Sequence, residues 1–224
     1  MPQLEPQAQP ASRSPSRDDE APARKRPKPG ERRVQILQAL ASMLQQPGLE
    51  RITTAALAAR LEVSEAALYR HFASKAQMVE GLIDFIEQTV FALVNQIAQQ
   101  DITGAGSGRP PGARQAARVL AMVIQFAEKN PGMARVMVGD ALVYENERLQ
   151  QRMNHFFDKL EASLRQCLRV GAATDGSDTP TVDALVQASL LTAFLVGRLQ
   201  RFARSGFKRQ PSEHLEASLD RLLG

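Results

Sequence analysis

Residues 53–72 read TTAALAARLEVSEAALYRHF and predict two short helices joined by a tight turn. The first helix is expected over 54–60 and the turn over 61–63, and the second helix begins after Ser64 and continues to Phe72. Small residues dominate where the helices must cross closely, and four apolar side chains supply a small core: Leu57, Val63, Leu68 and Phe72. This layout is typical of a helix-turn-helix motif.

The outward-facing positions of the motif carry groups suited to DNA. Small side chains near the start of the second helix let its backbone enter a major groove, where Ala66 can touch a thymine methyl group. Polar side chains lie around this position and are expected to face the groove or contact phosphates: Thr53, Thr54, Ser64, Glu65, Tyr69, Arg70, His71 and Lys75. A generic two-helix hairpin would explain the apolar positions but not this polar cluster.

The segment before the motif has a different composition. Residues 1–30 hold seven of the thirteen prolines and are expected to be disordered, because they cannot bury enough apolar surface to offset the entropy of ordering. A basic run over 24–28 continues to Arg32 and Arg33, which are expected to contact the phosphate backbone or a minor groove. A nuclear-import signal and a solvated run of charges are the alternatives.

Helical periodicity dominates the chain after residue 30. The first apolar stripe comprises Val34, Leu37, Leu40, Ala41 and Leu44. Ser74, with Gln77 three residues later, is expected to cap a long helix to about residue 100, whose stripe comprises Val79, Ile83, Ile86, Val90, Val94 and Ile97. Further helices are expected over 113–129, from 131, over 145–170 with Gly171 ending it, and over 180–204. No run alternates with period two, so the sequence predicts an all-α fold with a DNA-binding domain over 31–75 and a larger helical domain over 76–224.

The segment 180–204 is apolar on nearly every face. One face can fill the core of its own protomer, so the other is expected to pack against a second copy of the chain, with Gly197 allowing close approach. The residues expected at this dimer interface are Leu191, Phe194, Gly197 and Phe202. A central helix buried wholly within one protomer is the alternative.

Composition restricts the remaining classes of function. Lys and Arg outnumber Asp and Glu by 28 to 24, a small excess that suits contact with a polyanion. The single cysteine, Cys167, falls on an apolar stripe and is expected to be buried, which fits a reducing cytoplasm. We expect no membrane span, because the longest uncharged stretch, 184–197, is shorter than the stretch of about 18 apolar residues that a spanning helix requires. We also expect no cofactor, no metal site and no catalytic residue. The three histidines are far apart, and neither a phosphate-binding glycine loop nor a nucleophile motif is present.

The motif also resembles a known family. Thr53-Thr54, Val63-Ser64, Leu68-Tyr69, His71-Phe72 and Ser74-Lys75 are similar to the N-terminal signature of TetR-type regulators. Members of that family are helical dimers in which a three-helix reading head is followed by a larger ligand-binding or partner-binding domain. The resemblance extends over most of residues 32–211 to the nucleoid occlusion factors, the SlmA group of this family, through Asn130-Pro131-Gly132, Arg148-Leu149-Gln150, Leu164-Arg165-Gln166 and Arg201-Phe202.

This narrower resemblance implies a function in cell division. Such proteins are homodimers that bind palindromic chromosomal sites and antagonise polymerisation of the division GTPase FtsZ, which keeps the septum off the nucleoid. A homodimer and a higher oligomer on DNA are both left open by the sequence. The resemblance places the FtsZ C-terminal tail on the long helix after the reading head and on the helix that follows, at Phe85, Lys129 and Asn130. Phe85 lies off the core stripe on a flank with Met78, although burial in the core is an alternative for it.

Three positions depart from that group's pattern. Leu93 stands where the group carries a basic residue, and Met122 and Gln125 are altered near the expected tail site. An ordinary ligand-released TetR-type repressor, with a small-molecule pocket in its second domain, is therefore the alternative function. Either function implies a protein of the cytoplasm that associates with the nucleoid.

Overall fold

The computed structural model describes residues 30–46, 52–100, 108–139, 146–174 and 178–224, and these residues form helices without a strand. Residues 1–29 of the predicted disordered segment 1–30 lie outside the described residues. The helices are α1 (Glu31–Leu44), α2 (Thr54–Arg60), α3 (Glu65–Tyr69), α4 (Lys75–Gln99), α5 (Pro111–Lys129), α6 (Pro131–Met137), α7 (Glu147–Thr174), α8 (Pro180–Arg204) and α9 (Leu215–Leu223). The all-α prediction is confirmed for these residues.

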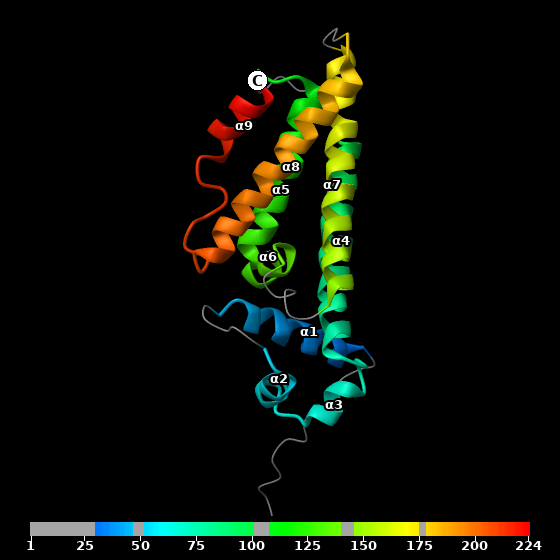
Figure 1. Ribbon diagram of the computed structural model, residues 1–224, viewed down its shortest axis with the longest axis vertical. Helices are drawn as coiled ribbons and strands as arrows, with labels where there is room; N and C mark the ends of the chain where they lie inside the picture. The colour runs from blue at the N-terminus through cyan, green and yellow to red at the C-terminus, as the bar shows by residue number, and fades with distance from the viewer. Residues whose placement is uncertain (1–29, 47–51, 101–107, 140–145, 175–177) are drawn as a thin grey trace, which may run out of the picture.

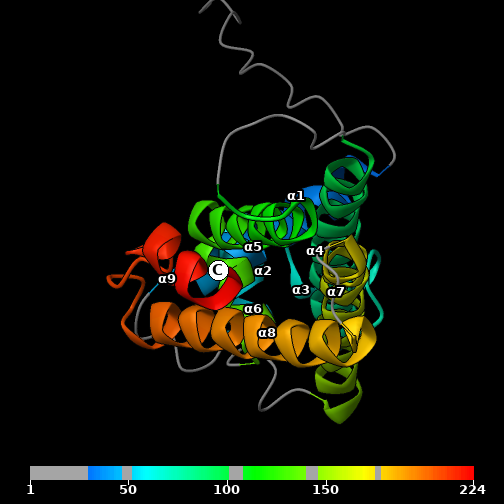
Figure 2. The ribbon, with the colours of Figure 1, turned by 90° about the horizontal axis from the view of Figure 1, so that it is seen from above.

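The helices divide into a small group at one end and a long bundle (Figure 1). We call α1, α2 and α3 the reading head, because they carry the predicted DNA-facing residues. Helix α4 starts beside the head and runs up the molecule alongside α7, while α5 and α8 complete the bundle and α6 lies between it and α1. Seen from above, α8 covers one whole side of the bundle and α9 packs against α5 and α8 (Figure 2).

Helix α4 follows the predicted pattern closely. The Ser74 hydroxyl accepts a hydrogen bond from the Gln77 N–H at 3.2 Å, and the Gln77 side-chain oxygen accepts one from the Ala73 N–H at 2.8 Å. The first bond satisfies a backbone donor that the first turn of a helix leaves unpaired, and the second holds the Gln77 side chain against the N–H group that precedes the cap. Of the predicted stripe, Ile97 is half-buried and the other members are buried: Val79, Ile83, Ile86, Val90 and Val94.

The core of the reading head also agrees with the sequence, except for the orientation of α1. Leu57, Leu68 and Phe72 are buried and Val63 is half-buried. On α1 the buried side chains are Ile36, Leu40, Met43 and Leu44, whereas Val34, which the sequence placed in the stripe, is 52% exposed. The predicted face is therefore confirmed at Leu40 and Leu44, is half-buried at Leu37 and Ala41, and is wrong at Val34, which lies on a flank of α1 that is only partly covered.

That flank meets the bundle at one tight contact. A Cβ atom at Gly132 would lie 2.2 Å from the backbone oxygen of Ala41, so only glycine lets α6 approach α1 this closely. One turn earlier on the same side of α1, Leu37 packs against Gly81 of α4. The head is therefore fastened to the bundle through both α4 and α6.

Two boundaries differ from the sequence prediction. Helix α7 does not end at Gly171 but continues to Thr174, since one glycine costs a helix only about 1 kcal/mol and the alanines that follow favour helix. Helix α9 was not predicted, although Leu215, Leu219 and Leu223 recur every four residues and are buried. The predicted loop over 101–112 ends earlier, because α5 already begins at Pro111.

Helix α8 corrects the predicted dimer interface. Leu191 and Phe202 are at most 1% exposed within a single protomer, so they belong to its own core and are not available to a partner. Phe194 is half-buried beneath the Arg198 guanidinium, which lies 4.6 Å from its ring centroid, and a Cβ atom at Gly197 would meet no atom within 4 Å. The prediction selected the larger apolar residues, but burial follows the face that α5, α6 and α7 cover.

The opposite face of α8 is apolar and uncovered. Val182, Leu185, Val186 and Leu190 are between 45% and 56% exposed. By length and composition alone α8 could cross a membrane, contrary to the sequence-based estimate, and one third of its most apolar window is buried. We name these four residues the outer face of α8.

Candidate nucleic-acid interface

The two helices of the motif begin with the same capping arrangement. The Thr53 hydroxyl accepts a hydrogen bond from the Ala56 N–H at 3.1 Å, and the Ser64 hydroxyl accepts one from the Ala67 N–H at 3.3 Å. Both hydroxyl groups act as acceptors in these caps, so their O–H bonds remain able to donate to phosphate oxygens. Both residues are exposed, at the end of the molecule that α2 and α3 form (Figure 1).

Thr54 behaves differently from Thr53. Its hydroxyl donates to the Glu65 carboxylate at 2.5 Å, which ties the start of α2 to the start of α3. A threonine hydroxyl has one proton, so Thr54 cannot donate to a phosphate while this bond holds. The predicted phosphate contact of Thr54 therefore requires the bond to Glu65 to open, and Glu65 is positioned to hold the two helices in register.

Helix α3 presents the predicted groove-facing residues but is shorter than expected. It ends at Tyr69 rather than Phe72, and the His71 and Phe72 N–H groups both donate to the Leu68 oxygen in the turn that follows. Ala66 and Arg70 are exposed, and Tyr69 is 46% exposed. The exposed side of α3 thus carries a small residue near its start and donor groups near its end.

Arginines of α1 and α3 surround this surface. The Arg33 guanidinium donates to the His71 carbonyl oxygen at 2.9 Å and lies 4.1 Å from the centroid of the Phe72 ring, so it fastens α1 to the end of α3. Arg32 donates to the Gln35 side chain. Each guanidinium carries five N–H donors, which leaves donors on both for phosphates. Arg70 makes no bond to a described residue, and Lys75 is half-buried at the first turn of α4.

This arrangement can recognise double-stranded DNA by ordinary groove chemistry. A short helix with alanine near its start fits a major groove, and the surrounding arginine, tyrosine and hydroxyl groups are phosphate donors. No group of three or more His, Cys, Asp or Glu side chains that could hold a metal ion occurs among the described residues.

The residues predicted to bind a partner form a second surface, on α4 and α5. Phe85 is 46% exposed and its ring lies 6.4 Å from that of Phe126. Lys129 is exposed at the end of α5, and the Asn130 side-chain amide donates to the Phe126 oxygen at 2.8 Å. Met78, which the sequence grouped with Phe85, is fully buried, because it lies on the side of α4 that faces the hydrophobic core. We name Phe85, Lys129 and Asn130 the α4–α5 patch.

A row of ion pairs between α4 and α7 was not found from the sequence. Arg148 pairs with Glu80 at 3.4 Å, and Arg152 pairs with Asp84 and, at 2.9 Å, with Glu87. Burial alone would lower the pKa of Arg152, but its hydrogen bonds and the charges of both carboxylates raise that pKa above the ordinary arginine value. Acidic residues every three or four positions on one helix, with arginines four apart on another, were the available sequence signal.

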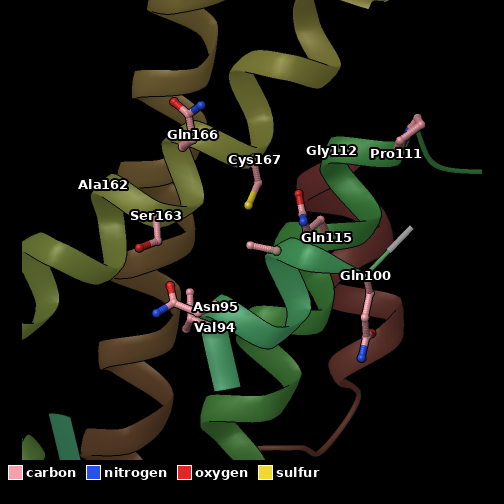
Figure 3. A pocket seen from close by; sticks show the side chains of 11 residues that line it. Val94, Asn95, Gln100, Pro111, Gly112, Gln115, Ala162, Ser163, Gln166 and Cys167 are labelled. Atoms are coloured by element: carbon pink, nitrogen blue, oxygen red, sulfur yellow. The ribbon is translucent and has the colours of Figure 1, made fainter. Parts of the chain in front are cut away.

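A cavity of about 680 Å³ lies between α4, α5 and α7, near the end of α4 that is opposite to the reading head. Figure 3 shows the side chains that line it. Its lining mixes amide and apolar side chains with the sulfur of Cys167, including Asn95, Gln100, Gln115, Ser163 and Gln166. The prediction that Cys167 is buried is confirmed, and burial raises the pKa of its thiol.

Two family models match the chain. The model described as "Bacterial regulatory proteins, tetR family" matches residues 36–82, and "Tetracyclin repressor-like, C-terminal domain", the SlmA-like form, matches residues 114–223. Together they span the reading head, α4 up to Leu82 and nearly all of the bundle from α5 onward.

Solved structures agree on the fold. FadR of Bacillus halodurans, a fatty acid degradation regulator, matches with a TM-score of 0.68 and 16% identity over 87% of this chain and 96% of its own. PfmR of Thermus thermophilus, a TetR family regulator, matches with a TM-score of 0.64 and 19% identity over 84% and 94%. At these identities the likeness establishes the fold alone.

Curated relatives are much closer in sequence. The nucleoid occlusion factor SlmA of Idiomarina loihiensis is 46% identical over 83% of this chain and 90% of its own length. SlmA of Vibrio vulnificus is 46% identical over 84% and 92%, and SlmA of Shewanella loihica 46% over 82% and 88%. The resemblance predicted from the residues is confirmed: the chain belongs to the nucleoid occlusion factor SlmA family of TetR-type regulators.

Proposed function

We propose that this chain acts as a homodimer that binds pseudo-palindromic chromosomal sites and, when bound, antagonises FtsZ assembly over the nucleoid. In this proposal residues 1–30 form a tail, 31–75 the DNA-binding domain and 76–224 the domain for dimerisation and partner binding. The protein would then work in the cytoplasm, on the nucleoid. One observation carries the proposal: in a chain this similar to nucleoid occlusion factors, Phe85 is 46% exposed and its ring lies 6.4 Å from that of Phe126, three residues before the exposed Lys129.

The dimer follows from the outer face of α8. Four large apolar side chains in a row on one helix are unusual on a monomer, and a twofold contact of α8 with a second copy would cover them. Two reading heads related by that axis fit half-sites about 34 Å, or one helical turn of DNA, apart. The interface now proposed comprises the outer face of α8 (Val182, Leu185, Val186 and Leu190) with Gly197. Leu191 and Phe202 are removed from it because they are buried, and Phe194 because the Arg198 guanidinium covers its ring.

Partner binding follows from the α4–α5 patch. The exposed Phe85 ring can anchor an apolar side chain of the FtsZ tail, and Lys129 can pair with a carboxylate on it. One N–H of the Asn130 side-chain amide donates to the backbone oxygen of Phe126, which fixes the amide at the end of α5 and leaves its second N–H and its oxygen for a peptide backbone. The patch lies outside the reading head, so both partners can bind together.

The test measures FtsZ antagonism and DNA binding on matched variants. Phe85→Ala should abolish the loss of sedimentable FtsZ polymer that the DNA-bound protein causes, because losing an aromatic anchor commonly costs about 2 kcal/mol. Its affinity for the operator should stay within twofold of the unaltered protein. Thr53→Ala should do the reverse, weakening operator binding while a labelled FtsZ tail peptide still binds. An unaltered, DNA-bound protein with no measurable affinity for the tail peptide would reject the proposal.

The cavity favours a second candidate, a ligand-released repressor. Its volume of about 680 Å³ falls within the range of small-molecule sites, and the structural neighbour FadR of Bacillus subtilis was solved in complex with stearoyl-CoA. A thermal-shift screen of small molecules, repeated on Gln115→Leu, addresses this candidate. A ligand that stabilises the unaltered protein, releases it from DNA and loses both effects in Gln115→Leu would favour the repressor.

A further inference from the structure

Two exposed cations share one strip of α5. Arg118 and Lys129 are eleven residues apart, which corresponds to three helical turns, so their side chains leave the helix in nearly the same direction about 16 Å apart. Neither makes a hydrogen bond or an ion pair with any described residue. Met122 lies between them, half-buried.

Contacts between α4 and α5 place Arg118 at the edge of the surface that carries Phe85. The Phe85 and Phe126 rings lie 6.4 Å apart near one end of the helix pair, and the Gln115 amide donates to the Ile97 oxygen at 3.2 Å near the other. The two helices are therefore antiparallel, and each step along α4 is matched by one step back along α5. Figure 1 shows the same antiparallel course. This register places Arg118 level with the half-buried Leu93 of α4.

No carboxylate of either helix neutralises these cations. On α4, Glu80, Asp84 and Glu87 face α7 and pair with Arg148 and Arg152. On α5 the single acidic residue, Glu128, accepts a hydrogen bond from the Ser212 N–H on another side of the helix. The surface between α4 and α5 thus offers the Phe85 ring, the half-buried Met122 and the exposed Gln125 in its middle, and toward each end one cation that pairs with no described residue.

We infer that Arg118 is a second cationic anchor of this surface, and that its occupant is an extended acidic peptide with an apolar anchor. This inference rests on the proposed function and extends the α4–α5 patch by three turns of α5. An extended chain rises about 3.3 Å per residue, so a peptide that pairs with both Lys129 and Arg118 carries its two acidic residues about five positions apart. Arg118 then sets the acid spacing that the site accepts.

The experiment uses the full-length protein and a fluorescently labelled FtsZ C-terminal tail peptide, titrated at low ionic strength. Arg118→Ala should weaken binding about threefold, the loss typical of one exposed ion pair, and Arg118→Glu about tenfold or more. The matched control is Arg221→Glu, which makes the same charge change at an exposed arginine of α9. It should leave peptide affinity within twofold.

A charge exchange identifies the partner of Arg118. Each acidic residue of the peptide is replaced by lysine in turn, and one of these peptides should regain affinity for Arg118→Glu while losing it for the unaltered protein. If Phe85→Ala weakens binding but Arg118→Glu does not, the inference about Arg118 is wrong and the proposed function stands. If the unaltered protein does not bind the peptide at all, the proposed function fails and the inference with it.

Discussion

Neighbouring positions of α8 provide a direct test of the dimer, because the same substitution has opposite consequences at each. Leu190 is 55% exposed and belongs to the outer face, whereas Leu191 is fully buried in the protomer. Burying a whole leucine side chain is worth about 2 kcal/mol, so covering the exposed half of Leu190 contributes about 1 kcal/mol per protomer. A twofold interface counts this contribution twice.

Leu190→Glu should therefore dissociate the dimer without unfolding the chain. It removes about 2 kcal/mol of burial across the interface and places two unpaired carboxylates in it, which brings the loss to about 4 kcal/mol or more and raises the dissociation constant about a thousandfold. Size-exclusion chromatography with light scattering at micromolar concentration should report a monomer, and circular dichroism a normal helix content.

Leu191→Glu, the matched control, buries a charge inside the protomer and should lose most of the stability of the fold. Its melting transition should fall steeply or disappear. If Leu190→Glu remained dimeric, the outer face of α8 would not be the interface.

Three further predictions concern the fold. Gly132→Ala should destabilise the protein by about 1–3 kcal/mol, measured by urea unfolding, because its Cβ atom would overlap the Ala41 oxygen. Arg152→Met should cost about 1 kcal/mol, with a smaller difference at high salt, since its ion pairs with Asp84 and Glu87 are partly exposed. Burial raises the pKa of Cys167, so its thiol should react slowly with a disulfide reagent until urea unfolds the chain. The fold favours the neutral thiol, so its contribution to the free energy of unfolding is fully present below the ordinary thiol pKa of about 8.5 and is lost as the pH rises above that value.

The fold was largely predictable because its signals are local. The capping hydroxyls of Thr53, Ser64 and Ser74 each accept a hydrogen bond from the N–H group three residues later. The apolar stripe of α4 likewise depends only on the helical spacing of residues within one helix. Errors arose where the outcome depends on neighbouring helices. The sequence could not show which face of α8 the bundle covers, so Leu191 was assigned to the interface although it belongs to the core.

The site was predictable by residue type but not by bonding state. Sequence reasoning selected Thr54 and Arg33 as phosphate contacts, yet Thr54 donates to Glu65 and Arg33 donates to the His71 oxygen. The first bond joins two residues that are 11 positions apart in the sequence, and the second joins two that are 38 positions apart. Pairs at such separations cannot be recognised from a helical repeat. Phe85 was correctly placed outside the core because it lies off the apolar stripe of α4. Met78 was wrongly grouped with it, because the buried face of α4 is wider than that stripe and includes Met78.

Helix α4 is the element through which DNA and partner binding can influence each other. It begins at Lys75, directly after the reading head, and carries Phe85 about 15 Å further along its axis. Its other side is held to α7 by the Arg152 ion pairs, and Gly132 fixes α6, the neighbour of Asn130, against α1. A shift of the head on DNA would therefore be carried to both sides of the α4–α5 patch rather than absorbed by a loop. Linkage requires the effect to be reciprocal: the factor by which operator DNA raises the affinity for the FtsZ tail must equal the factor by which the tail raises the affinity for operator DNA.

Two titrations measure these factors. Arg152→Met, which loosens α4 from α7, should reduce both factors equally. Equal tail affinities with and without DNA would show instead that the two surfaces act independently.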